Sequence, residues 1–277
     1  MSVNKQLVNK ADHYNDPQHN YPQYWEGRDY EHAAEVLALK RLLHGKRFKH
    51  ALDVGGGYGR LCVVLDAYAD RVTLADPSRK QLEFARDFLK DHPQIECRLL
   101  QADNLKLQSG SIDLLTMIRV LHHLPAPIAE FFEIARVLSD DGCVVIEVAN
   151  YTHALNRLKH LFKIKSLPIT PVDIRSAENR RADEMPFVNH NPVTVIEQLS
   201  HAGLRVERTL SVSNLRSAAL KKLMPLRIML ALEKPMQQMF AASYFGPSIF
   251  FLAKKCWAGS KRVGLVDPMS RTVFPRI

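Results

Sequence analysis

Long hydrophobic runs are missing from this 277-residue sequence. The longest stretch without a charged residue, 235–253, contains two prolines, a glycine and two adjacent glutamines, so it does not fit a membrane-spanning helix. The first ten residues hold no apolar signal-peptide core, and we expect a cytoplasmic protein. Because 46% of the residues are hydrophobic, the chain can still build an ordinary buried core.

Cysteine is scarce, and its spacing excludes the usual metal-binding motifs. The chain has four cysteines and no C-x-x-C pair. Those at positions 62, 97 and 143 fall inside apolar runs, where free thiols commonly act as packing residues. We therefore expect reduced, structural cysteines and no metal site.

Glycine is infrequent too, with 12 in the chain, yet four of them stand together in A-L-D-V-G-G-G-Y-G-R at 51–60. The apolar residues before them predict a short buried strand. After them, residues with the i, i+3, i+4, i+7 spacing of a helix face follow at Leu61, Val64, Leu65 and Tyr68. The glycines must form a turn with positive φ, which presents backbone N–H groups and a helix N-terminus to a ligand.

The spacing of these glycines selects the ligand class. The dinucleotide fingerprint G-x-G-x-x-G is absent, because its third glycine would fall on Arg60. The arrangement that fits is D-x-G-x-G-x-G, made by Asp53, Gly55, Gly57 and Gly59. It closely resembles motif I of the class I S-adenosylmethionine-dependent methyltransferases. The carboxylate of Asp53 suits a cofactor that carries an ammonium group, whereas it would repel a pyrophosphate.

Two later strands of the predicted sheet end in acids. Arg71–Ala75 predicts a strand that ends at Asp76, and Ile95–Leu100 predicts another, followed by Q-A-D-N-L. An acid at the tip of the second strand can accept hydrogen bonds from both ribose hydroxyls of an adenosine. The family resemblance implies a cofactor site made by the loop and these strand ends, namely Asp53, Gly55, Gly56, Gly57, Gly59, Asp76, Pro77, Asp103, Asn104 and Arg119.

The fourth predicted strand, S-I-D-L-L-T-M-I, is followed by R-V-L-H-H-L-P, which again resembles small-molecule members of this family. Ligands of open parallel sheets lie beyond the carboxyl ends of the strands, so Arg119, His122 and His123 should lie near the transferred methyl group. His122 or His123 could serve as a general base. The alternative is that one histidine packs against the cofactor loop and the other faces solvent.

The alternation of strands and helices predicts a three-layer αβα sandwich with a seven-stranded, mainly parallel sheet. We divide the chain into an N-terminal lid segment and helix, 1–45, a methyltransferase domain, 46–255, and a basic tail, 256–277. Two insertions, 151–191 and 214–246, interrupt the domain. The lid is implied by the resemblance and would explain the tyrosines and tryptophan near the N-terminus; the alternative is a surface tail.

The first insertion should shape acceptor choice, since it follows the fifth strand at the edge where ligands bind. It opens with a short, basic, amphipathic helix and ends in F-V-N-H-N-P. We take Asn189 and His190 as acceptor-side candidates, with His190 a speculative catalytic residue. The alternative is that both residues only form the turn before a helix at Pro192–His201.

The net charge of +9 lies in the last part of the chain, because residues 214–277 carry eleven Lys/Arg and two Asp/Glu. Residues 215–245 could therefore contact an anionic membrane through Lys221, Lys222 and Arg227 while Leu and Met side chains insert. The alternative is a helical subdomain or dimer surface whose methionines are core residues. The sequence does not fix the oligomeric state.

These observations predict an enzyme that transfers the methyl group of S-adenosylmethionine to a small acceptor, with lipophilic molecules among the candidates. Nucleic acid is a weaker candidate, because neither an (N/D)-P-P-(F/Y) motif nor a Pro-Cys nucleophile pair follows the fourth strand. A non-catalytic S-adenosylmethionine-binding or assembly protein also remains open. Nothing in the sequence names the acceptor or its attacking atom.

Overall fold

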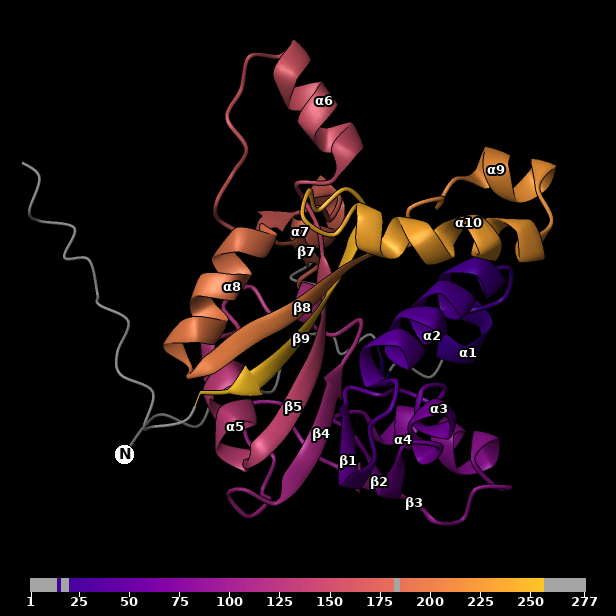
Figure 1. Ribbon diagram of the computed structural model, residues 1–277, viewed down its shortest axis with the longest axis vertical. Helices are drawn as coiled ribbons and strands as arrows, with labels where there is room; N and C mark the ends of the chain where they lie inside the picture. Colours follow the sequence, from indigo (N-terminus) through magenta and orange to yellow (C-terminus); the bar gives the residue numbers. More distant parts are fainter. Residues whose placement is uncertain (1–13, 16–19, 182–184, 257–277) are drawn as a thin grey trace, which may run out of the picture.

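The computed structural model describes residues 14–15, 20–181 and 185–256, and within them a seven-stranded sheet forms the centre of the molecule (Figure 1). Its spatial order is β3-β2-β1-β4-β5-β9-β8. The strands are β1 (Phe48–Val54), β2 (Ala69–Asp76), β3 (Ile95–Leu99), β4 (Ile112–Met117), β5 (Leu138–Ala149), β8 (Leu204–Val212) and β9 (Ser248–Lys255). Only β9 runs antiparallel to its neighbours, so the predicted mainly parallel sheet is confirmed.

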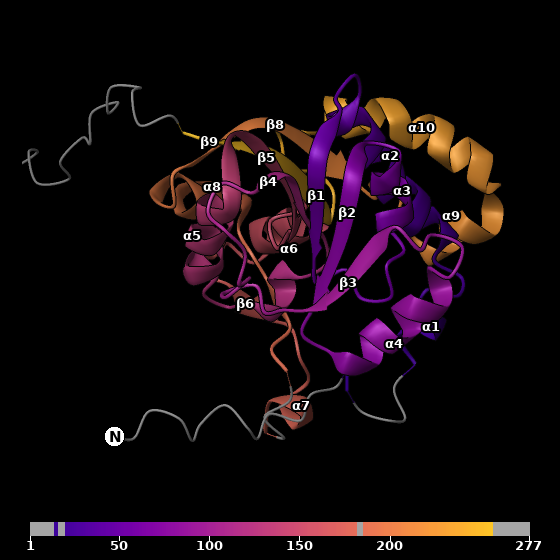
Figure 2. The same cartoon turned by 90° about the horizontal axis from the view of Figure 1, so that it is seen from below.

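Helices cover both faces of the sheet and complete the three-layer sandwich (Figure 2). On one face lie α2 (Asp29–Leu43), α3 (Cys62–Asp66), α4 (Arg79–Phe88) and α10 (Leu226–Met239). On the other lie α5 (Ile128–Val137) and α8 (Pro192–His201). This arrangement confirms the predicted αβα fold.

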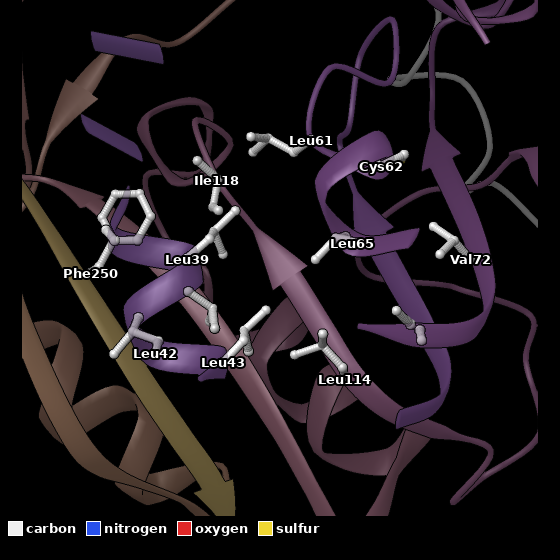
Figure 3. Close-up of a cluster of buried hydrophobic side chains, with 14 of the residues drawn as sticks. Leu39, Leu42, Leu43, Leu61, Cys62, Leu65, Val72, Leu114, Ile118 and Phe250 are labelled. Atoms are coloured by element: carbon white, nitrogen blue, oxygen red, sulfur yellow. The ribbon is translucent and has the colours of Figure 1, made fainter. Parts of the chain in front are cut away.

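The core beneath α2 and α3 is built from aliphatic side chains at helical spacing (Figure 3). Leu39, Leu42 and Leu43 of α2 lie on one helix face and are fully buried. Burial of each such side chain contributes about 1.5–3 kcal/mol. They pack with residues of α3 and of the sheet, among them Leu65, Leu114 and Phe250. The core therefore fixes α2 beside the carboxyl end of the sheet.

The first insertion forms short elements above the carboxyl ends of the strands. They are α6 (Ala154–Phe162), β6 (Val172–Asp173), α7 (Ala177–Arg181) and β7 (Val188–Asn189). Figure 1 shows α6 standing away from the rest of the molecule. A backbone bridge between Asn150 and His190 joins the end of the insertion to the end of β5.

The second insertion consists of α9 (Ala218–Leu223) and α10, and α10 packs on α2 and β8. Met229 is buried there, and Tyr30 of α2 donates a hydrogen bond of 2.8 Å to the buried carboxylate of Glu233. Lys221 is ion-paired to Glu31 of α2 at 2.6 Å, so it is not the free cation that the membrane-contact prediction required. This arrangement supports a helical subdomain for 214–246.

Some local predictions were wrong. From the polar composition of residues 1–28 one expects no regular structure before Asp29, yet α1 occupies Tyr21–Tyr24, because the Asn20 side chain caps its start and Pro22 occupies its first turn. The segment 139–142, S-D-D-G, has the composition of a turn, yet it belongs to β5 at a register shift in its pairing with β4. The helix after the glycine turn, α3, has only five residues.

Several predictions concern residues that the structure does not describe. The predicted tail, 256–277, lies outside the described residues except for Cys256, and so does much of the predicted lid segment. No helix in the described part of the chain is long and apolar enough to cross a membrane. Among the same residues, no group of three or more His, Cys, Asp or Glu side chains is arranged to hold a metal ion.

Candidate functional site

The glycine turn after β1 adopts the conformation that its sequence predicted. Gly55, Gly57 and Gly59 have φ values of +66°, +58° and +86°, a region that residues with a Cβ rarely adopt. A Cβ at Gly55 would overlap Val120 of the loop after β4, and one at Gly59 would lie 2.8 Å from Leu89 Cδ1. The turn is therefore packed from both sides by neighbouring loops and helices, and only glycine fits at these positions.

Asp53 lies beneath this turn and does not line a cavity. Thr116 Oγ1 donates a hydrogen bond of 2.6 Å to Asp53 Oδ1, and Cys62 Sγ lies 3.5 Å from Oδ2. Burial raises the pKa of the carboxyl, although these hydrogen bonds oppose the shift. A Cβ at Gly56 would lie 2.7 Å from Oδ2, so the carboxylate supports the turn from behind. In this geometry Asp53 supports the turn, and its direct contact with the cofactor stays a prediction.

Asp76 lies at the end of β2 and is held against the turn. Its carboxylate accepts hydrogen bonds from the Gly57 N–H at 2.9 Å and from the Ser78 N–H at 2.8 Å. Pro77 is exposed between them. The same carboxylate therefore connects the second strand to the glycine turn, at the edge of the sheet where the resemblance placed a ribose.

Asp103 and Asn104 lie on the outer rim. Both are exposed, in a tight turn in which Gln101 bridges to Asn104, while Leu105 is buried beneath them. Neither residue lines the large cavity described below. Their predicted contact with an adenine stays a prediction.

Aromatic residues of the N-terminal segment cover the turn. The Tyr21 ring would lie 3.1 Å from a Cβ at Gly57, so it packs directly on that glycine. The Tyr14 hydroxyl and His123 Nε2 lie 2.8 Å apart, and Ser78 Oγ donates to the Tyr14 carbonyl at 3.0 Å. Burial raises the pKa of both tyrosines. These aromatic residues lie where the predicted lid would, and the lid itself stays a prediction.

A buried ion cluster that the sequence did not reveal joins the N-terminal helix to the site. Glu35 of α2 accepts hydrogen bonds from Arg60 Nη2 at 2.5 Å and from Arg119 Nε at 2.6 Å. Both guanidinium groups lie over the Trp25 ring, at 3.7 and 4.9 Å from its centroid. Burial alone would raise the pKa of Glu35, but the two arginines lower it, so the carboxylate is charged.

Arg119 is placed by this cluster at the boundary between the glycine turn and a cavity. Its φ of +61° is unusual for a residue with a side chain, and its N–H donates to Glu147 Oε2 at 3.2 Å. Its guanidinium is ion-paired to Glu35 through Nε, and Arg119 also lines the cavity. The predicted role as a cofactor contact remains open for this residue.

The cavity lies over the carboxyl ends of β4, β5 and β8 and has a volume of about 970 Å³. Its wall combines the loop after β4, the first insertion and the start of the second insertion. Polar residues from three strand ends, His122, Glu147 and Ser213, line it together with apolar residues of the insertion such as Leu155, Ile174 and Phe187. The position and mixed lining are those of a binding site for an organic molecule.

His122 lies in the wall of this cavity, in the 3₁₀ turn η1 (Leu121–His123). Its ring packs 4.5 Å from Phe187, and neither ring nitrogen has a hydrogen bond to any described residue. Burial, assisted by His123 and Arg119, holds the pKa of His122 well below its ordinary value. The ring is therefore neutral at physiological pH and can accept a proton.

His123 and His190 are occupied by structural hydrogen bonds. His123 Nδ1 donates to the Pro186 carbonyl at 2.9 Å, which leaves Nε2 to accept from Tyr14. The His190 ring is 2% exposed, does not line the cavity, and donates from Nε2 to the Leu121 carbonyl at 2.9 Å. His190 thus holds the turn that carries His122, and this geometry does not fit a catalytic role for it. Asn189 does line the cavity.

Glu147 and Ser213 are cavity residues that we did not predict. Glu147 Oε1 accepts a hydrogen bond of 2.5 Å from Ser248, and burial raises the pKa of its carboxyl. Ser213 is 1% exposed with a φ of +59°, and its hydroxyl has no hydrogen-bond partner among the described residues. Glu147 could have been found, since it is the single acid in the apolar run C-V-V-I-E-V-A at the end of a strand. Ser213 gives no such signal.

Comparison with known proteins supports the class of protein that the fold and the turn indicate. Residues 52–146 match the family model described as a methyltransferase domain. Over 122 residues the chain is 30% identical to the ubiquinone biosynthesis O-methyltransferase of Xanthomonas campestris. The match covers 43% of this chain and 50% of that protein. A Dictyostelium discoideum protein provisionally named as a methyltransferase is 33% identical over 96 residues, 35% of each chain.

Solved structures show the same fold. An S-adenosylmethionine-dependent methyltransferase from Mesorhizobium loti superposes with a TM-score of 0.57 at 19% identity, over 82% of this chain and 100% of that one. Residues 52–146 thus match the methyltransferase-domain model, and the fold around them is the one that class I S-adenosylmethionine-dependent methyltransferases share. The chain spans about half or less of the length of these curated relatives.

The family and the fold imply S-adenosylmethionine as the cofactor, and the residues present fit it. Gly55, Gly57 and Gly59 let the backbone of the turn adopt positive φ without side chains, and the Asp76 carboxylate lies at the end of β2, the position from which an acid can accept hydrogen bonds from ribose hydroxyls. The sulfonium is a cation, and it suits a boundary formed by tyrosine rings and Glu147. These are the residues that would hold the cofactor.

Proposed function

We propose that this protein transfers the methyl group of S-adenosylmethionine to a nucleophile of a small organic acceptor that occupies the 970 Å³ cavity. The observation that carries the proposal is the direct packing of Val120 on Gly55, which joins the glycine turn to the loop that bears His122. Donor site and acceptor cavity thus share one boundary. Bound S-adenosylmethionine supplies an electrophilic methyl group on its sulfonium.

The chain contributes mainly by placing the two reactants and excluding water. In-line transfer needs the acceptor atom opposite the leaving sulfur, and most of the rate enhancement can come from holding that geometry. Tyr14 and Tyr21 cover the turn, and Tyr14 is held there by Ser78 and His123. A closed aromatic cover of this kind keeps water away from the methyl group.

His122 is the residue best placed to act as a general base. Its ring is neutral and lines the cavity, and neither nitrogen is hydrogen-bonded to a residue that the structure describes. An acceptor that arrives as a hydroxyl or a protonated amine must lose a proton when it is methylated, and His122 can take it. Glu147 and Ser213, across the strand ends, would then orient the polar part of the acceptor.

The acceptor class we favour is a lipophilic molecule that carries a hydroxyl group. The apolar insertion residues in the cavity wall support a lipophilic body, and the polar strand ends support a reacting group. Curated relatives that match part of this chain are named ubiquinone biosynthesis O-methyltransferases, which supports oxygen as the attacking atom. Nitrogen and carbon nucleophiles remain the alternatives that the same cavity would accept.

The test is release of S-adenosylhomocysteine from S-adenosylmethionine in the presence of a panel of phenols, quinols, amines and short RNA. We expect turnover with a lipophilic hydroxyl compound, and His122→Asn should lower kcat about 100-fold, the range of a general base. His201→Asn, on the exposed end of α8, is the matched control and should leave kcat unchanged.

The pH profile adds an independent check. Because the pKa of His122 is lowered, the neutral ring persists through pH 6.5 and activity should fall only as pH drops through that lowered value. Binding of S-adenosylmethionine without turnover on any compound would favour the non-catalytic alternative, and turnover on RNA alone would replace the small acceptor with a nucleic acid.

A further inference from the structure

The helix α6 and the loop that follows it, residues 151–171, form an arm whose apolar side chains face solvent. Leu155, Leu158, Leu161 and Phe162 lie on one face of the helix by their i, i+3, i+4 spacing, and they are 66%, 50%, 73% and 79% exposed. Ile164 and Ile169 of the loop are 95% and 72% exposed. No residue of α6 is buried. A contiguous apolar surface of this kind marks an interaction site.

The charge of the arm identifies the chemistry of its partner. Residues 151–171 contain four Lys/Arg and no Asp or Glu. Lys159, Lys163 and Lys165 are exposed, and none of their side chains has an ion pair or hydrogen bond to any described residue. Exposed lysines beside a large aliphatic stripe suit a surface that is negatively charged outside and apolar beneath.

The arm stands at the mouth of the acceptor cavity. Figure 1 shows α6 projecting from the molecule beyond the other elements. At its base, His153, Ala154 and Leu155 form part of the cavity wall. Whatever the arm contacts is therefore brought next to the cavity entrance.

We propose that the arm docks on the surface of an anionic lipid bilayer, with the leucines, Phe162 and Ile164 in the acyl boundary and the lysines at the headgroups. An amphipathic helix binds in this way when its apolar face is buried in the interface and its cations meet anionic lipids. The proposal concerns the surface of the protein and does not depend on methyl transfer. It moves the predicted membrane contact from 215–245 to 151–171.

Other occupants fit the arm less well. Nucleic acid would use the lysines but leave six large aliphatic and aromatic side chains in water. A second copy would bring two sets of four cations together. The helix α10 also exposes leucines, but it buries Met229 and Gln237 against the body and its apolar residues Ile228 and Leu232 are each 44% exposed.

Liposome flotation of the full chain tests the proposal. We expect it to float with phosphatidylcholine vesicles that contain phosphatidylglycerol, and not with phosphatidylcholine alone. The double variant Leu161→Ser/Phe162→Ser should reduce recovery at least about tenfold, because it removes two inserted side chains. Lys159→Gln/Lys163→Gln should weaken binding to the anionic vesicles by about fivefold per lysine. Ile228→Ser/Leu232→Ser in α10 is the matched control and should float like the wild type.

The outcomes separate the alternatives. Both α6 residues are exposed, so circular dichroism and S-adenosylmethionine binding should be unchanged in the variants. The proposal fails if the wild type floats on neither vesicle, if it floats equally on both, or if only the α10 variant loses binding. It also fails if light scattering shows that the wild type is a dimer and that only the α6 variant is a monomer, since the arm would then bind a second copy.

Discussion

Two neighbouring regions at the carboxyl ends of the strands, the glycine turn and the cavity, differ in how completely their polar groups are satisfied. On the side of the glycine turn, the charged groups are paired: Asp53 with Thr116, Asp76 with two backbone N–H groups, and Glu35 with two arginines. On the side of the cavity, His122 and Ser213 have no partner among the described residues, and α6 exposes its apolar face. The polar groups beside the turn are satisfied by the protein itself, whereas the cavity side has polar groups and apolar side chains that a ligand or a partner can contact.

The family match follows this division only in part, because it includes His122 of the cavity and excludes Glu35 of the turn side. It covers 52–146 and ends one residue before Glu147, the first cavity residue of β5. The donor side binds one fixed molecule, so its turn and strand ends follow a recognisable spacing. The acceptor side carries what is particular to this protein, and its chemistry must be derived from its own residues.

The largest expected effect tests the donor side. Glu35→Gln would leave Arg60 and Arg119 buried without their counter-charge, and breaking such a cluster costs about 3–5 kcal/mol. Urea unfolding should show that loss of unfolding free energy. Asp70→Asn, which breaks the exposed pair with Arg47, is the matched control and should cost less than about 1 kcal/mol. Equal losses in both variants would contradict the distinction between the buried cluster and an ordinary surface pair.

The same cluster has a pH signature. The pKa of Glu35 is lowered in the folded protein, so the stabilisation it provides is fully present above its unfolded pKa, roughly 4.3, and is lost as pH falls through the folded value. The wild type should therefore lose stability in acid. Glu35→Gln should flatten this part of the profile.

The sequence predicted the fold from apolar runs and the donor site from spacing, because both are local signals. The seven-stranded sheet and the residues of its first four strands were predicted, and the turn at 55–59 has the predicted glycine conformation. Local sequence signals do not predict which distant residue a side chain will contact. Glu35 and Arg119 are 84 residues apart, and His190 looked like a site residue although its ring bonds the Leu121 carbonyl. Such pairings are set by tertiary packing.

The next prediction asks whether Gly55 is required because a Cβ there would overlap Val120, or only because its φ is positive. Gly55→Ala and Gly110→Ala both place a Cβ at positive φ, which costs roughly 1–2 kcal/mol of stability. Only at Gly55 does the new atom overlap another residue, Val120, since Gly110 has open space within 4 Å. Gly55→Ala should weaken S-adenosylmethionine binding at least about tenfold by calorimetry, because the turn must shift. Unchanged affinity for S-adenosylmethionine in Gly55→Ala, or an equal loss in Gly110→Ala, would contradict the assignment of the turn to the cofactor site.

The smallest expected effect tests the acceptor side. There, removal of a buried hydroxyl that has no described hydrogen-bond partner should raise the free energy of unfolding, whereas most substitutions lower it. Ser211 and Ser213 are both buried, but the Ser211 hydroxyl donates to Asn214 Oδ1 and accepts from the Gly246 N–H, whereas the Ser213 hydroxyl has no described partner. An unsatisfied buried hydroxyl costs stability, so Ser213→Ala should raise the free energy of unfolding by about 1 kcal/mol and Ser211→Ala should lower it by a similar amount. Thermal and urea unfolding of the two variants measure this difference.

A gain of stability in Ser213→Ala accompanied by a higher KM for the acceptor would mean that the hydroxyl is kept for binding at the expense of the fold. The side chain lies just after β8, in the wall that also holds Glu147, so an acceptor in the cavity can supply its partner. If Ser213→Ala instead destabilises the protein as much as Ser211→Ala does, the hydroxyl is already satisfied in solution. The acceptor side would then be as complete as the donor side, and the contrast between the two would rest on His122 and α6 alone.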